Sequence, residues 1–114
     1  MENEEIKKKD VHIIVEIIDY LPKSIVRKTI LKKITGNITA TSFDRGEELE
    51  EKVYPFDNYI QIIDGTAEVT IDGKIFHLNL GEGIVIPAHT RRSFSAREKF
   101  KMLSTIIKSG FEDL

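Results

Sequence analysis

The stretches GEELEEKVYPFDNYIQIIDG, residues 46–65, and GEGIVIPAHTRRSF, residues 81–94, decide the fold. Each begins at a glycine and carries a short apolar run bounded by turn-forming residues. Between them, residues 67–71 alternate apolar and polar side chains, which predicts a strand with one buried face and one solvated face. The Asp72-Gly73 pair that follows supplies the positive φ angles that a tight hairpin turn requires. The two stretches therefore predict successive parts of one small β-barrel.

Working outward, β-branched runs recur along most of the chain, which is typical of an all-β protein. The expected strands are residues 25–34, 38–43, 59–63, 67–71, 75–80, 84–86, 93–96 and 100–107. Tight turns are expected at Gly36-Asn37 and Asp64-Gly65 as well as at Asp72-Gly73, so that neighbouring strands pair. We interpret the arrangement as a mainly antiparallel meander.

The N-terminal residues carry a weaker signal. Residues 1–9 are mostly charged and have no apolar face to bury. Residues 11–21 are rich in Ile and Val and end before Pro22, so they form either a strand or one amphipathic turn, and we favour extended structure. We expect one domain over residues 1–114, with the barrel at 24–108 and a segment, 1–23, that packs on it or is exchanged with a second subunit.

Composition narrows the class of protein. The 114 residues are 40% hydrophobic and 32% charged, which favours one folded globular unit. A net charge of −2 disfavours nucleic acid as a partner, and the absence of cysteine excludes disulfides and thiolate chemistry. The sequence has no apolar run long enough for a membrane span and no signal-peptide core, so no membrane partner and a cytoplasmic location are expected.

Taken together, the two stretches resemble the two motifs of the cupin superfamily, over roughly residues 24–107. The first motif of that family runs Gly, five residues, His-x-His, three or four residues, Glu, six residues, Gly, and residues 46–65 keep its frame and both glycines. The second runs Gly, five residues, Pro-x-Gly, two residues, His; residues 81–92 keep this frame, with His89 in place of the glycine. The resemblance implies a double-stranded β-helix, or jelly-roll barrel.

The resemblance also implies a metal site, but its four ligand positions are altered. They fall on Lys52, Tyr54, Asn58 and Arg92. An ammonium and a guanidinium repel a cation where several imidazoles or carboxylates would be needed. We therefore expect no metal and no cofactor.

The same positions form a candidate binding pocket. If their side chains point into the barrel, they and His89 offer hydrogen-bond donors suited to a carboxylate or phosphate. The candidate pocket residues are Lys52, Tyr54, Asn58, His89 and Arg92. A purely structural alternative remains open, in which Lys52 extends into solvent and Arg92 pairs with Asp57 or Glu51. His12 is interpreted as a boundary residue and His77 as a surface or interface residue.

Three functions remain open. The first is a metal-free domain that binds a small anionic or sugar-like molecule. The second is a metal-independent isomerase or epimerase, like some enzymes of the superfamily, in which His89 or Tyr54 exchanges protons with the substrate. The third is a non-catalytic structural or interaction protein. The strand at residues 59–63 is apolar on both faces, which indicates either packing under the N-terminal segment or a homodimer interface.

Overall fold

The computed structural model describes residues 5–108, except for the side chain of Glu51. Nine strands and one short 3₁₀ helix, η1 (Ile14–Glu16), occupy this range. The strands are β1 (Ile25–Lys33), β2 (Gly36–Phe43), β3 (Glu48–Val53), β4 (Asp57–Gly65), β5 (Ala67–Ile71), β6 (Lys74–Leu78), β7 (Gly83–Ile86), β8 (Arg91–Ser95) and β9 (Phe100–Ile107). No helix within residues 5–108 is long and apolar enough to cross a lipid bilayer.

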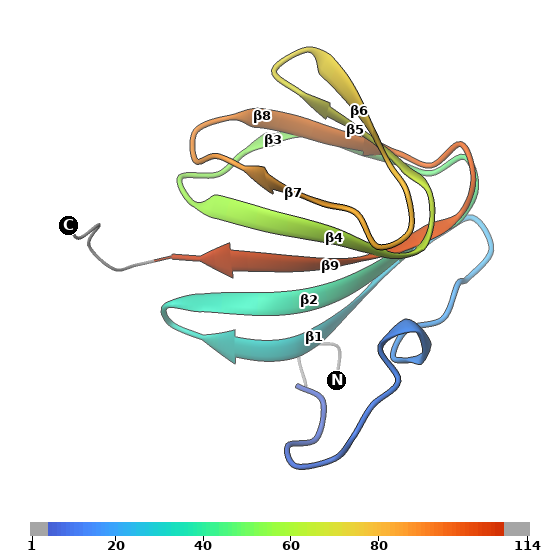
Figure 1. The fold of residues 1–114 in the computed structure, drawn as a ribbon, viewed down its shortest axis with the longest axis vertical. Helices are drawn as coiled ribbons and strands as arrows, with labels where there is room; N and C mark the ends of the chain where they lie inside the picture. The colour runs from blue at the N-terminus through green and yellow to red at the C-terminus, as the bar shows by residue number, and fades with distance from the viewer. Residues whose placement is uncertain (1–4, 109–114) are drawn as a thin grey trace.

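The strands form two sheets that face each other (Figure 1). The five-stranded sheet has the order β1-β2-β9-β4-β7, and the four-stranded sheet has the order β3-β8-β5-β6. The strand pairs described in residues 5–108 are all antiparallel. This arrangement confirms the predicted all-β jelly-roll barrel.

The prediction of a meander was wrong in its pairing. The tight turns join only neighbours such as β1–β2 and β5–β6, whereas β2 pairs with β9 and β3 pairs with β8. Such distant partners are brought together by the packing of the two sheets, which short-range turn signals do not report. The Asp72-Gly73 turn is confirmed, with φ angles of 48° and 83°.

Two local predictions also need correction. Residues 64–65 do not form a turn, because they continue β4 and pair with β9. Gly65 is needed there for another reason: its φ is +74°, and a Cβ at this position would collide with the backbone oxygen of Lys99. The turn expected at Gly36-Asn37 is centred on residues 34–35.

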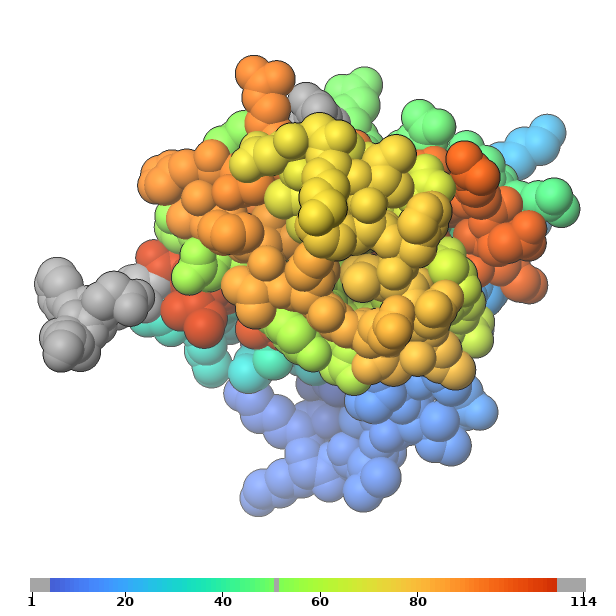
Figure 2. Space-filling model, turned by 45° about the horizontal axis from the view of Figure 1, so that its top comes forward, coloured from blue at the N-terminus to red at the C-terminus, as the bar shows by residue number. Residues whose placement is uncertain are grey.

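The N-terminal segment contains no strand between residues 11 and 21, so the expectation of extended structure was wrong there. It lies against the outer face of the five-stranded sheet, away from β5 and β6 (Figure 2). The hydroxyl of Tyr20 donates to Asp64 Oδ2 at 2.6 Å, and the ammonium of Lys101 donates to the carbonyl of Val15 at 2.7 Å. Ile18, within the segment, is only 5% exposed. The segment therefore covers part of its own barrel.

Aromatic side chains close one end of the space between the sheets. Phe43 and Phe100 are cross-strand partners, and their rings stack with centroids 4.4 Å apart. Phe94, from the opposite sheet, lies 6.0 Å from Phe43. Ile60 and Ile62 of β4 complete this fully buried core. Because the large residues gather at this end, the opposite end of the barrel is left hollow.

The outer face of the five-stranded sheet is only partly covered. Tyr59 is 43% exposed, Val85 58% and Ile107 64%. Exposed apolar groups on one face are consistent with a protein partner. The homodimer therefore stays a prediction.

Candidate functional site

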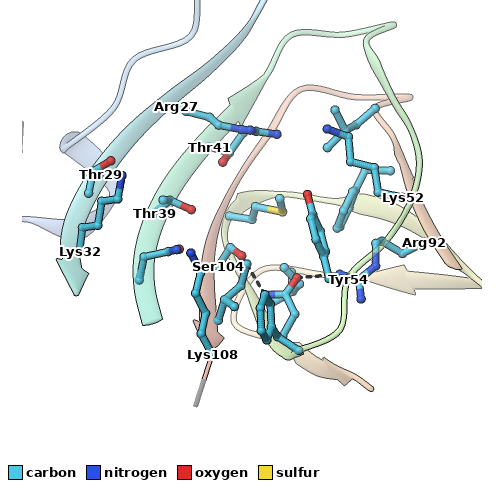
Figure 3. A pocket seen from close by; sticks show the side chains of 18 of the residues that line it. Arg27, Thr29, Lys32, Thr39, Thr41, Lys52, Tyr54, Arg92, Ser104 and Lys108 are labelled. Carbon is cyan, nitrogen blue, oxygen red and sulfur yellow. Dashed lines mark hydrogen bonds between the residues drawn. The ribbon is translucent and has the colours of Figure 1, made fainter. Parts of the chain in front are cut away.

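A cavity of about 360 Å³ lies between the two sheets (Figure 3), and Phe94 of the phenylalanine cluster is among its lining residues. Its walls come from β1, β2, β4 and β9 of one sheet and from β3 and β8 of the other. Leu49, Ile60, Phe94 and Met102 make its deep surface apolar. A volume of this size is typical of a pocket for a small molecule and too large to be a packing defect.

Cross-strand register explains which side chains of the five-stranded sheet face the cavity. One row across β1, β2, β9 and β4 consists of Lys32, Asn37, Ile106 and Asn58. The next row consists of Thr29, Thr39, Ser104 and Ile60. Because side chains alternate along a strand, rows two residues apart present the same face, and both rows line the cavity. This wall is mostly polar in both rows, and Ile60 and Ile106 are their apolar members.

A β-bulge in β1 determines the charge of the mouth. Thr29 pairs with Thr39, but the next pair is Leu31 with Ile38, so Ile30 is an extra residue. An extra residue shifts the alternation of the strand beyond it by one position. Lys32 therefore faces the cavity on the same side as Arg27, whereas unbroken alternation would have placed Leu31 there.

Arg92 is the most unusual side chain of the site. It is 2% exposed, and its Nη1 donates to Asn58 Oδ1 at 2.9 Å while its Nε donates to the carbonyl of Thr90 at 3.3 Å. Its Nη2 is buried and has no hydrogen-bond partner among the described residues. Burial lowers the pKa of the Arg92 guanidinium. A buried cation with an unpaired donor is costly unless something in the cavity accepts from it.

Asn58 holds Arg92 in place. Its Nδ2 donates to Ser104 Oγ at 2.9 Å and to the carbonyl of Thr105 at 3.0 Å, so its Oδ1 is left to accept from Arg92. The alternative pairing of Arg92 with Asp57 is not found, since Asp57 Oδ1 accepts from the backbone N–H of Ala88. Pairing with Glu51 lies outside the described side chains. The buried guanidinium is thus held by neutral partners.

Lys52 and Tyr54 approach Arg92 from β3 and the loop after it. Lys52 is the cross-strand partner of Arg92 and is exposed at the mouth. The Tyr54 ring lies 4.9 Å from the guanidinium carbon of Arg92, a cation–π contact. The structure therefore brings together four of the five predicted pocket residues, Lys52, Tyr54, Asn58 and Arg92, around one cavity.

His89 does not line the cavity, which corrects our expectation for this residue. It is exposed in the turn before β8, and its backbone N–H donates to the carbonyl of Tyr54 at 2.7 Å. Its φ is +63°, the left-handed conformation that the glycine of the motif adopts easily. The backbone of the motif is retained here, and the imidazole points elsewhere.

The other two histidines also lie outside the cavity. His77 is exposed on β6, with Nδ1 3.7 Å from Glu68, as expected for a surface residue. His12 contacts the backbone oxygen of Lys7 in the N-terminal segment.

The residues at the four motif positions do not fit a divalent cation. The guanidinium of Arg92 and the ammonium of Lys52 offer only donors, and the carbonyl oxygen of Asn58 is taken by Arg92. Among residues 5–108, no three His, Cys, Asp or Glu side chains gather closely enough to hold a metal ion.

The charges around the cavity are strongly unbalanced. Five cationic residues line it: Arg27, Lys32, Lys52, Arg92 and Lys108. Glu50 is the one carboxylate among the described lining residues. Sequence reasoning missed Arg27, Lys32 and Lys108, because they lie outside both motifs. Regular alternation along β1 predicts that Arg27 faces the cavity, but the bulge at Ile30 prevents the same prediction for Lys32.

Comparison with solved structures shows several close matches in fold. A conserved protein of unknown function from Streptococcus pyogenes matches with a TM-score of 0.88 and 26% identity, over 97% of each chain. A cupin superfamily protein from Desulfitobacterium hafniense matches with a TM-score of 0.86 and 20% identity, over 96% of this chain and 100% of that one. A cupin 2 conserved barrel domain protein from Leptotrichia buccalis matches with a TM-score of 0.80 and 33% identity, over 82% of this chain and 46% of that one.

Sequence comparison alone is less informative. No protein-family model matches the chain. A polyketide synthase, CurC, from Streptomyces cyaneus is 32% identical over 50 residues, which are 43% of this chain and 32% of that protein. The chain thus aligns with about a third of the length of this curated relative.

Proposed function

The chain is a small cupin domain, and from that premise we propose that its barrel binds a small anionic molecule without the help of a metal ion. The observation that carries the proposal is a cavity whose described lining includes five cations and one carboxylate and which borders Arg92, a buried cation whose Nη2 has no hydrogen-bond partner among the described residues. A carboxylate or phosphate oxygen is the acceptor that such a donor lacks.

The apolar walls strengthen the proposal. Leu49 and Phe94 form the cross-strand pair next to Arg92 on the inner side, and with Met102 they line the cavity beside its guanidinium. In such surroundings the attraction between a cation and an anion is greater than in bulk water. The hydrogen bond from Arg92 to Asn58 keeps the guanidinium in position before a ligand arrives, so little order is lost on binding.

The two alternative functions have less support. An isomerase or epimerase would need a proton-exchanging group held by an orienting carboxylate. His89 lies outside the cavity, and Tyr54 faces Arg92 rather than a carboxylate. A purely structural barrel would be expected to be filled by side chains, whereas this one encloses about 360 Å³.

Isothermal titration calorimetry with phosphate, acetate and a neutral hexose tests the proposal, on protein whose metal content has been measured. We expect binding of at least one anion, at least about tenfold weaker in Arg92→Gln, and unchanged in Arg91→Gln. Arg91 is a matched control because it precedes Arg92 on β8 and faces away from the cavity. Stoichiometric tightly bound metal, binding of the hexose alone, or equal anion affinity in both variants would refute the proposal.

A further inference from the structure

The cations around the cavity are not clustered at one point. Arg92 and its cross-strand partner Lys52 belong to the four-stranded sheet, and Arg92 is joined to Asn58 on β4. Lys32, on the edge strand β1, and Lys108, which directly follows the central strand β9, lie on the other side of the cavity (Figure 3). They are neighbours because the backbone N–H of Lys108 donates to Thr35, in the turn that follows Lys32.

The separation of the two sides follows from the sheet order. Lys32 and Asn58 are the two ends of one cross-strand row, with β2 and β9 between them. Three strand spacings of about 4.8 Å place their Cα atoms roughly 14 Å apart. A lysine side chain that reaches toward the centre shortens the gap between its ammonium and Arg92 to roughly 8–14 Å. One carboxylate or phosphate bridges donors about 8 Å apart at most, so a single group reaches both only at the lower limit of this range.

The surface between the two sides is suited to a chain that carries hydrogen-bonding or methylene groups. Thr29, Thr39 and Ser104 line one wall, and Leu49 and Phe94 line the opposite wall. Among the described lining residues Glu50 is one carboxylate against five cations, so the cavity carries a positive potential that favours an anionic ligand.

Resting on the proposed function, we infer that the ligand of this barrel is an elongated dianion. One anionic group pairs with the guanidinium of Arg92, and the other lies between Lys32 and Lys108 at the mouth. The chemical class is a linear molecule with a carboxylate or phosphate at each end and a spacer about as long as that of adipate.

Adipate and monomethyl adipate are the probes, since they share a length and differ by one charge. We expect adipate to bind about tenfold more tightly at low, fixed ionic strength, where exposed charges are least screened. Lys32→Gln should weaken adipate binding roughly fivefold, as expected for a partly exposed ion pair, and leave the monoester unaffected. Lys28→Gln is the matched control, because Lys28 is on the same strand and faces away from the cavity. It should change neither affinity.

Succinate separates contact from a general electrostatic field, because it is too short to reach both sides. Its affinity should be insensitive to Lys32→Gln. The inference is overturned if Lys32→Gln weakens succinate as much as adipate, or if adipate and its monoester bind equally. In both cases loss of binding in Arg92→Gln would still support the simpler anion pocket, whereas the absence of binding by all these anions would overturn both proposals.

Discussion

Replacing Arg92 by methionine should make the ligand-free protein more stable. Methionine has a similar length, fills irregular space and carries no charge. The wild-type guanidinium is 2% exposed, is paired only with neutral acceptors among the described residues, and leaves Nη2 without a partner. In the absence of an anion, the fold bears the full desolvation of this cation.

The expected change in the free energy of unfolding is the difference between the desolvation cost that is removed and the contacts that are lost. Desolvation of a buried cation, including its unpaired donor, costs several kcal/mol. The variant loses the hydrogen bond to Asn58 and the ring contact with Tyr54, which together are worth about 2–3 kcal/mol. We expect a net gain of about 1–2 kcal/mol, or a rise in the midpoint of thermal unfolding of about 4–8 °C.

Thermal and urea unfolding in anion-poor buffer and in saturating adipate provide the assay. Adipate at about a hundred times its dissociation constant should stabilise the wild type by about 2.7 kcal/mol and the variant by almost nothing, which reverses their order. If Arg92→Met unfolds more easily than the wild type in both buffers, by a similar amount, then Arg92 is a structural cation and the reasoning is wrong. Arg91→Met, on the outward face of β8, controls for the loss of one positive charge.

Three further predictions concern the charge of the cavity, one backbone position and the response to acid. Glu50→Gln removes the carboxylate that lines the cavity, so calorimetry should show adipate binding about two- to fivefold tighter; weaker binding would mean that Glu50 contacts the ligand favourably. Gly65→Ala should lower the free energy of unfolding in urea by at least about 2 kcal/mol, because φ is +74° and the new Cβ would meet the Lys99 carbonyl; a change below about 0.5 kcal/mol contradicts the described backbone. Backbone N–H groups of Lys23 and Arg45 lower the pKa of the Asp44 carboxyl, so its contribution to stability is present above about pH 4 and is lost as the pH falls through the lowered folded-state pKa. Urea midpoints of Asp44→Asn between pH 3 and pH 6 should therefore fall less steeply with acid than those of the wild type, and parallel curves would contradict the assignment.

The barrel was predictable because its signals are local or repeated. The Asp72-Gly73 turn and the alternation of residues 67–71 fix the β5–β6 hairpin, and the glycine frame of the two motifs resembles that of cupins. β3 was missed because an edge strand near the surface carries charges that resemble a solvated loop. The N-terminal segment was misread because its apolar residues cover the outside of a sheet rather than join one.

The candidate site was predictable only in part. Four residues were found because the motif frame aligns Lys52, Tyr54, Asn58 and Arg92 with inward-facing positions. The partner of Arg92 was not predicted, because the sequence places both acidic residues and an amide where they could pair with it. Lys108 reaches the cavity through pairing of β9 with two distant strands, and no short-range pattern reports that register.

The extra residue in β1 has an evolutionary consequence. Removal of Ile30 alone would restore regular alternation, turn Lys32 outward and place Leu31 at the mouth of the barrel. Deletion of a single codon, without any change at the motif positions, would thus replace a charged side chain at the mouth of the barrel by an apolar one. Related barrels can diverge in the molecules they accept through the length of this strand as readily as through substitutions in the pocket itself.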